Sequence, residues 1–243
     1  MNNFILVIPA RLKSTRYPNK VIKKINGKEL FVHVWEKCSK VCNKKDIFIA
    51  TPDQKIIDLC KKKKINFIKT SQNCLTGTDR IIEISKKIRK DFYINVQADE
   101  ILVSPKSILK VIKECKKNKL RFVINAYTSI KYKSDYKASS VPKVVLDNNN
   151  FLNYISRSPI PGNKQGKFIK AFKQVCIYAF PHKHLSKIQF NKKSYNEIYE
   201  DIEILRFIDN NIKVKMIKAQ GSKIAIDTLK DYKNAIAYFK RKK

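Results

Sequence analysis

The residues with the clearest chemical potential are acids that follow separate apolar runs. Asp99 and Glu100 come almost directly after Phe92–Val96, and adjacent carboxylates at the end of a central strand suit a hard cation such as Mg²⁺. This placement is informative in a chain with 20 acidic against 53 basic residues. The alternative is a turn or a helix-capping pair. Asp227 follows the run Ile224–Ile226, where it could be the second metal carboxylate or simply the cap of the last helix.

A basic loop follows the first apolar run. Phe4–Ile8 predicts a strand buried on both faces, as in a parallel sheet, and Pro9 ends it. Four cations then stand beside two hydroxyls: Arg11, Lys13, Arg16 and Lys20, with Ser14 and Thr15. Such a loop suits a polyphosphate, because ligands bind at the carboxyl edge of open α/β sheets. It lacks the glycines and the Lys-Ser/Thr ending of a P-loop, so side-chain charge would hold the phosphates. A plain basic surface loop is the alternative.

Strands and helices alternate along the chain, which predicts an α/β fold with a doubly wound, mainly parallel sheet. Further strands are predicted at 46–50, 65–68, 92–96, 120–127, 175–180, 213–217 and 224–227. Helical spacing is seen at 31–36, 56–60, 81–88, 199–207 and 229–239. We expect one domain over 1–243.

A β-hairpin is inserted late in this pattern. Lys143–Leu146 and Phe151–Ile155 flank an Asp-Asn-Asn-Asn turn, and the extended piece Ser156–Pro161 follows with Arg157. The polar stretch Gly162–Lys170 predicts a loop. We expect residues 142–180 to shape the acceptor side of a pocket or a dimer contact.

Two polar stretches have both a structural and a functional interpretation. In Thr76-Gly-Thr-Asp-Arg80, Thr78 or Asp79 could cap the next helix, while Gly77 allows a close backbone approach and Arg80 could reach a base or phosphate. A capped helix start explains this stretch equally well.

The predicted helix Tyr199–Phe207 places Glu200 and Glu203 one turn apart, with Arg206 following. These residues could form a charge ladder on a solvated face or contact a polar ligand. Without further comparison, the ladder is favoured.

The net charge of the chain has two interpretations, a polyanionic partner or a compositional bias. The net charge of +33 would suggest nucleic acid or an anionic membrane, yet the lysines are spread through every segment and no nucleic-acid motif accompanies them. The abundance of Lys, Asn and Ile indicates a compositional bias at exposed positions. We therefore expect no specific nucleic-acid partner.

The compartment is inferred from the apolar runs and the cysteines. The six cysteines have no CxxC pair and predict reduced thiols. No run is long enough to insert into a membrane, and the short N-terminal apolar run lacks a preceding basic segment. We expect a cytoplasmic protein.

Six stretches, taken together and in order, resemble the 3-deoxy-manno-octulosonate cytidylyltransferase (CMP-Kdo synthetase) family over nearly the whole chain. They are IPARLKSTRYPNK, TGTDR, NVQADE, PKVVLDNNNFLNYISRSPIP, EDIEILR and AIDTLKDY. The resemblance implies a Mg²⁺-dependent homodimeric enzyme of lipopolysaccharide or capsule biosynthesis. It implies transfer of CMP from CTP to the anomeric 2-hydroxyl of 3-deoxy-D-manno-octulosonate (Kdo), with release of pyrophosphate.

The same resemblance assigns roles to thirteen residues. The CTP-binding set is Arg11, Ser14, Arg16, Lys20, Arg80 and Gln97. Asp99 and Asp227 are the metal carboxylates, and they form the catalytic set together with Lys20 and Arg11. The sugar-binding set is Arg157, Gln174, Tyr178, Glu200 and Glu203. The matched motifs contain no histidine, so Asp99, acting through the metal, is the expected activator of the hydroxyl.

This chain departs from the usual pattern of the family at several positions. Ala98 and Ile101 stand where the family has Gly and Pro, and Asn19 stands where a glycine is common. On the acceptor side, the usual His-x-Gly-Ile-Tyr reads Gln174-Val-Cys176-Ile-Tyr, and the arginine expected soon afterwards is absent around Phe180-Pro181. The nucleotide half therefore matches better than the sugar half. The alternatives are a cytidylyltransferase for another ulosonic or nonulosonic acid, and a non-catalytic basic protein that binds polyanions.

Overall fold

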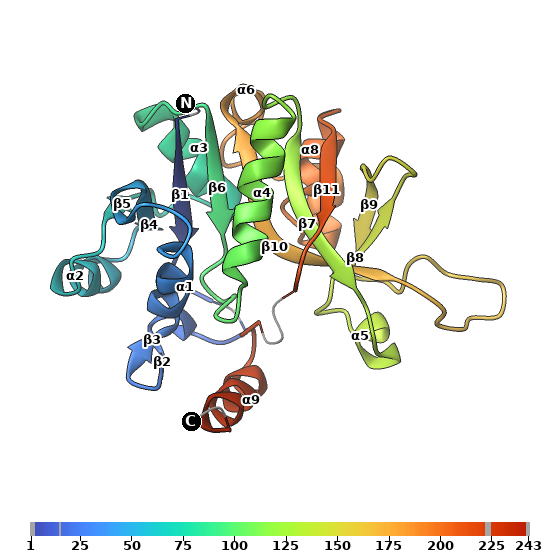
Figure 1. Ribbon diagram of the computed structural model, residues 1–243, viewed down its shortest axis with the longest axis horizontal. Coiled ribbons are helices and arrows are strands. Elements are labelled where there is room, and N and C mark those ends of the chain that lie inside the picture. Colours follow the sequence, from blue (N-terminus) through green and yellow to red (C-terminus); the bar gives the residue numbers. More distant parts are fainter. Residues whose placement is uncertain (1–2, 15, 222–224, 242–243) are drawn as a thin grey trace.

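The computed structural model describes residues 3–14, 16–221 and 225–241. Across these residues a nine-stranded sheet forms the middle of the molecule, with the main strand order β11-β7-β10-β6-β1-β4-β5 (Figure 1). The main strands are β1 (Phe4–Pro9), β4 (Ile47–Thr51), β5 (Phe67–Lys69), β6 (Phe92–Val96), β7 (Val123–Ser129), β10 (Phe172–Pro181) and β11 (Val214–Lys218). Neighbouring strands are parallel except β10, which is antiparallel to both β6 and β7. The predicted mainly parallel sheet is confirmed.

The predicted hairpin is also present. It consists of β8 (Lys143–Leu146) and β9 (Leu152–Ser156), and β8 continues the sheet by pairing with β10. Asn150 makes the reversal possible, since its φ of 59° lies in the left-handed region that asparagine tolerates. In Figure 1 this hairpin and the long loop after it extend from one end of the sheet. A second, two-stranded sheet joins β2 (Lys24–Ile25) and β3 (Lys28–Glu29).

Helices cover both faces of the sheet. On one face α4 packs on β7, β10 and α1, and on the other α3 packs on β1 and β6 (Figure 1). The helices are α1 (Leu30–Cys38), α2 (Gln54–Lys62), α3 (Gly77–Lys87), α4 (Pro105–Lys117), α5 (Lys133–Lys137), α6 (His182–Leu185), α7 (Tyr195–Glu200), α8 (Leu205–Asp209) and α9 (Leu229–Lys240). Short 3-10 helices occupy η1 (Lys20–Ile22) and η2 (Lys44–Asp46). No helix within these described residues is long and apolar enough to cross a membrane.

Strand β1 explains why the sheet needs two helical layers. Successive side chains of a strand point to opposite faces. Leu6 and Ile8 belong to the core beneath α1 and α4, whereas Ile5 and Val7 belong to the core beneath α3 and α8. All four are buried, so a continuous apolar run is what this position requires.

The continuous helix predicted over Tyr199–Phe207 is wrong. Helix α7 ends at Glu200, Asp201 adopts a left-handed φ of 48°, and α8 begins only at Leu205. The break separates two acids that a straight helix would place on one face. Glu200 accepts hydrogen bonds from β9 and the residue after it, while Glu203 accepts them from α3. These tertiary contacts outweigh the local helical pattern.

Two other predicted boundaries are corrected. The N-cap of α3 is Thr76 rather than Thr78 or Asp79, and Asp79 completes a capping box from the third helical position. The predicted strand over 224–227 is not formed at residues 225–227, and Ile224 lies outside the described residues. The backbone there makes a single link to the sheet edge, from the Ile226 N–H to the Asp99 carbonyl at 3.2 Å. The cap of α9 is Thr228, which leaves the Asp227 side chain for other contacts.

Candidate active site

A cleft of about 930 Å³ opens at the carboxyl ends of β1 and β6. This is the edge where ligands bind in doubly wound sheets. Of the thirteen residues predicted for the site, the cleft is lined by Arg11, Ser14, Arg16, Lys20, Arg80, Gln97, Asp99, Arg157, Gln174, Tyr178, Glu203 and Asp227. The thirteenth, Glu200, is not among the lining residues. Thr15 lies outside the described residues.

The centre of the cleft is a lysine held by two carboxylates. Lys20 Nζ lies 2.7 Å from Asp99 Oδ2 and 2.9 Å from Asp227 Oδ1. Arg16 adds a second cation at 3.2 Å from the same oxygen of Asp227. The Lys20 side chain is 13% exposed and both acids are about a quarter exposed, so the cluster is sheltered but open to a ligand.

Electrostatics keeps the lysine charged. Burial on its own would lower the pKa of Lys20, but the charges of Asp99 and Asp227 and their hydrogen bonds outweigh it, so the pKa lies above its ordinary value of 10.5. Lys20 is therefore an ammonium at any pH near neutrality, and it is a donor rather than a proton acceptor.

The backbone brings these three residues together. Asn19 has a left-handed φ of 57°, which turns the chain into η1 so that Lys20 faces the cleft. A hydrogen bond from the Asn19 N–H to the Leu12 carbonyl closes the preceding loop. The Asp53 carboxylate accepts a hydrogen bond from the Leu12 N–H at 2.8 Å. On the side of the cleft opposite this loop, the backbone hydrogen bond from Ile226 to Asp99 places Asp227 next to the end of β6.

The first turn of α3 forms one wall of the cleft. Arg11 donates from Nη1 to the Leu75 carbonyl at 3.2 Å, which ties the basic loop to this wall. Arg80 is almost fully buried, and its Nη1 donates to Thr70 Oγ1 and to the Ser71 carbonyl. Burial lowers the pKa of Arg80.

The acceptor side contains an arginine that binds backbone carbonyls. Arg157 donates to the carbonyls of Glu200, Ser139 and Asp201 at 2.6, 3.0 and 3.0 Å. The Glu200 carboxylate in turn accepts the Arg157 N–H and the Ser156 hydroxyl. In this structure, therefore, Arg157 and Glu200 fasten β9 to the end of α7.

A β-bulge shapes the remaining wall. The register of β10 against β7 shifts between Val175 and Tyr178, and Cys176 lies in the bulge. Buried Asn125 spans it, donating to the carbonyls of Val175 and Ile177 and accepting from Gln174 Nε2. Burial raises the pKa of the Cys176 thiol well above its ordinary value, and the neighbouring carboxylates Glu100 and Asp99 raise it further.

Sequence reasoning missed Asn125 and the polar groups behind α3. An asparagine inside the apolar run 120–127 is itself a signal, because a buried amide needs hydrogen-bond partners. The sequence pattern predicts Arg206 only as part of a charge ladder on a solvated face, and this prediction is wrong because Arg206 is 1% exposed. Its acidic partners Asp79 and Glu197 are distant in sequence, so no local pattern identifies them.

The carboxylates of Asp99 and Asp227 suit a hard divalent cation whose coordination is completed by oxygen atoms of a bound ligand. Two carboxylates meet around one cationic atom, which is the kind of oxygen pair that Mg²⁺ uses beside substrate phosphates. Within the described part of the chain, no group of three or more His, Cys, Asp or Glu side chains could hold a metal without such help.

The fold and the cleft together define a nucleotidyltransferase. The cytidylyltransferase family model matches residues 5–224. The chain belongs to this family, and within it to the 3-deoxy-manno-octulosonate cytidylyltransferases. Proteins of that name from Chloroherpeton thalassium and Trichlorobacter lovleyi are 33% and 29% identical to it, and the matches cover 98% and 95% of this chain and 98% and 96% of theirs.

One solved structure is highly similar over nearly the whole chain. It is CMP:2-keto-3-deoxy-manno-octonic acid synthetase complexed with CTP, which is 26% identical, with a TM-score of 0.90 over 99% of this chain and 100% of that one. A cytidylyltransferase from Leptospira borgpetersenii, 14% identical with a TM-score of 0.67 over 99% of this chain and 88% of that one, shares the fold.

Proposed function

We propose that this protein transfers CMP from CTP to the anomeric 2-hydroxyl of Kdo, giving CMP-Kdo and pyrophosphate. The observation that carries the proposal is the contact of Asp99 and Asp227 with Lys20 inside a cleft that Arg11 and Arg16 also line. Membership of the family and the similarity to a CTP complex support the same reaction.

The reaction needs positioning and charge neutralisation more than covalent chemistry from the protein. The hydroxyl oxygen bonds to the α-phosphorus as the bond from that phosphorus to the bridging oxygen breaks, and pyrophosphate leaves with that oxygen. Lys20, Arg11 and Arg16 stabilise the charge on the phosphates, with Ser14 nearby. Asp99 favours loss of the hydroxyl proton, which passes to solvent water. Histidine is absent from the described lining of the cleft, so no histidine base is proposed.

We propose Mg²⁺ as the cofactor, held by Asp99 and Asp227 together with phosphate oxygens. When bound, the ion supplies a lower pKa for the hydroxyl and neutralises charge on the phosphates. Removal of divalent ions with EDTA should stop turnover, and added Mg²⁺ should restore it. Full activity in EDTA would contradict this assignment.

The acceptor is tested by a panel of acids. Pyrophosphate release from CTP and Mg²⁺ is measured with Kdo and with other ulosonic and nonulosonic acids, and the series is repeated with UTP. We expect Kdo with CTP to give the highest kcat/KM. A higher value with another acid would favour the related transferase, to which the altered Gln174 and Cys176 point. Retention on heparin without acid-dependent pyrophosphate release would favour a polyanion-binding protein.

The wider setting follows from the same resemblance. We propose a cytoplasmic homodimer that supplies activated Kdo for lipopolysaccharide or capsule biosynthesis. Helix α7 exposes a cluster suited to burial against another copy, in which Tyr195, Ile198 and Tyr199 are 71%, 59% and 74% exposed. Light scattering after chromatography should give twice the mass of the chain, and Ile198→Asp should lower that mass if α7 is the contact.

A further inference from the structure

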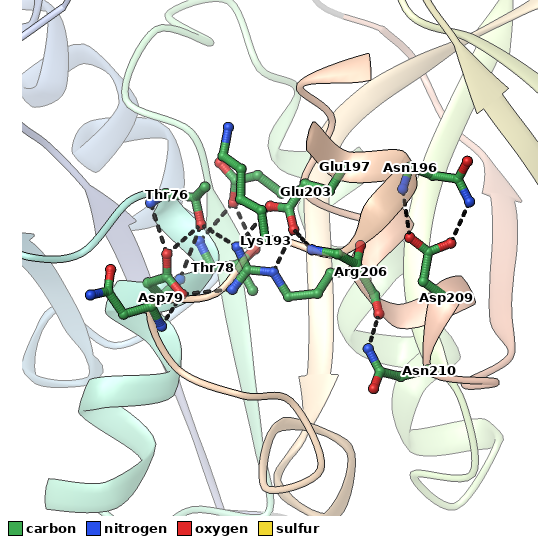
Figure 2. Close-up of polar contacts among 12 residues, drawn as sticks. Thr76, Thr78, Asp79, Lys193, Asn196, Glu197, Glu203, Arg206, Asp209 and Asn210 are labelled. Carbon is green, nitrogen blue, oxygen red and sulfur yellow. Dashed lines mark hydrogen bonds and ion pairs between the residues drawn. The ribbon is translucent and has the colours of Figure 1, made fainter. Parts of the chain in front are cut away.

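A buried ionic cluster lies behind the wall formed by α3. Figure 2 shows its members converging from two regions, the start of α3 and the segment from α7 to α8. The cluster contains two buried acids, Asp79 and Glu197, on either side of the guanidinium of Arg206. These three side chains are at most 1% exposed, so the charges face one another rather than solvent.

We propose that Glu203 and Arg206 are positioning residues that clamp the first turn of α3 and thereby set the nucleotide half of the cleft. The inference rests on the proposed use of CTP and extends it to residues that do not belong to the phosphate-binding loop. Glu203 and Arg206 together contact four consecutive residues, 76–79, which comprise the N-cap and the first three residues of α3.

The clamp is made by two side chains three positions apart. Glu203 accepts from the Gly77 N–H at 3.2 Å, the Thr78 N–H at 2.7 Å and the Thr78 hydroxyl at 2.6 Å. Arg206 donates from Nη1 to Asp79 Oδ1 at 2.6 Å and, weakly, from Nη2 to Thr76 Oγ1 at 3.5 Å. Both side chains therefore reach the same helix terminus.

Arg206 is itself held in place. Its Nε and Nη2 donate to the two oxygens of Glu197 at 2.6 and 2.7 Å, a bidentate geometry that fixes the guanidinium plane. Burial on its own would lower the pKa of Arg206, but Glu197 and Asp79 outweigh it and raise the pKa. The cation therefore stays charged, and its direction toward Asp79 is determined.

The clamp reaches the cleft through Gly77. A Cβ atom at this glycine would lie 3.1 Å from Gln97 Nε2 and 3.4 Å from both oxygens of Glu203. The Gln97 amide thus packs directly over the first residue of α3, beside the carboxylate that holds it. A shift of this turn would move Arg80 and change the packing of Gln97, the two residues assigned to the nucleotide outside the basic loop.

Glu203 also determines where phosphate does not bind. The free N–H groups at the start of a helix attract anions, but here an internal carboxylate accepts those of Gly77 and Thr78. The triphosphate is therefore directed to the cations of the basic loop. The acceptor-side segment that contains Glu203 and the nucleotide-side turn of α3 become one rigid wall.

The test is calorimetric titration of CTP, without sugar, into the wild type, Glu203→Gln and Arg206→Lys. Glu203→Gln keeps the shape but places an NH₂ group against an N–H donor, and Arg206→Lys keeps the charge but loses the fork. We expect the Kd for CTP to rise about tenfold in each variant, because each loses roughly one charge-assisted hydrogen bond that holds the first turn of α3 in place. The KM for CTP should rise with it, while kcat at saturating CTP should change less.

Asp209→Asn is the matched control. Asp209 accepts two hydrogen bonds from Asn196, which link the end of α8 to the start of α7, and it makes no hydrogen bond to the described residues of α3. The Asp209→Asn variant should lower the melting temperature about as much as Glu203→Gln does, and it should leave the Kd for CTP unchanged. An unchanged Kd in Glu203→Gln would overturn the proposal, as would an equal loss of affinity in Asp209→Asn. Since Glu203 is only half-buried, that variant decides the outcome even if Arg206→Lys fails to fold. Failure of the wild type to bind CTP would instead overturn the proposed function.

Discussion

Asp99 and Asp227 both contact a single atom, the Nζ of Lys20, at 2.7 and 2.9 Å. One acid follows strand β6 and the other precedes the last helix, so the fold brings distant segments to one cation. The acids outnumber that cation, and Arg16 at 3.2 Å from Asp227 supplies further positive charge. This arrangement joins the place where a metal would bind to the loop that would hold the phosphates.

Replacing Lys20 with Met should reduce pyrophosphate release by roughly 100-fold, because a preorganised charge aimed at the phosphates is lost. Lys20→Arg should retain part of the rate. The control is Lys24→Met, which removes an exposed lysine nearby and should be neutral. Turnover of Lys20→Met within a factor of two of the wild type would contradict the assigned role.

The raised pKa of Lys20 gives a prediction for pH. The pKa of Lys20 is higher in the folded state than its ordinary value of 10.5 in the unfolded chain. The stability that its charge contributes is therefore fully present below pH 10.5, and it is lost as the pH rises through the pKa of the folded state. The difference in unfolding free energy between wild type and Lys20→Met should therefore be constant from about pH 7 to pH 9 and shrink only in strong alkali. A difference that falls between pH 7 and 9 would show that the ammonium is not held as described.

Arg157 should act on the acceptor more than on the nucleotide. Arg157→Lys loses the planar fork that reaches three carbonyls, so the wall of β9 and the end of α7 should loosen. We expect the KM for the sugar acid to rise about tenfold, with the KM for CTP within about threefold of the wild type. The control is Lys193→Met, which removes a half-buried ion-pair partner of Asp201 that does not contact Arg157 in the described hydrogen bonds. Equal increases in both KM values would argue against an acceptor-side role.

Much of the sheet was predictable because each strand has its own apolar run. Phe4–Ile8, 92–96 and 143–146 form strands β1, β6 and β8 within a residue of their predicted bounds. The need for positive φ at Asn19 was also foreseeable, since asparagine there replaces a residue type with free φ. The position of the cleft followed from where these strands end.

Long-range polar contacts were not predictable in the same way. Helical spacing over 199–207 indicated one helix, but Glu200 and Glu203 bind different segments and the helix breaks at Asp201. The same holds for Arg206, whose burial depends on Asp79, a residue more than a hundred positions away. Local patterns contain no information on such partners, whereas the ordered motifs identify the residues of the cleft only through the family.

Asn125 should be important for stability. Asn125→Leu leaves the carbonyls of Val175 and Ile177 unpaired in the core and removes the partner of Gln174. Since each buried unpaired group costs roughly 1–3 kcal/mol, we expect the free energy of unfolding in urea to fall by about 3 kcal/mol. Asn148→Leu, in the exposed turn after β8, should change it by less than about 0.5 kcal/mol. A loss below about 1 kcal/mol at Asn125 would show that the amide does not support the bulge.

The most direct test of the account is sugar-dependent pyrophosphate release from CTP and Mg²⁺ by Asp99→Asn and Asp227→Asn. Each variant keeps the shape of the side chain while removing one of the two negative charges that contact Lys20. We predict that both lose at least about 100-fold in kcat with circular dichroism spectra and melting temperatures close to those of the wild type, while Asp58→Asn on the exposed face of α2 remains fully active. Near-normal turnover in either Asp99→Asn or Asp227→Asn would contradict the central claim that these two carboxylates form the catalytic cation site.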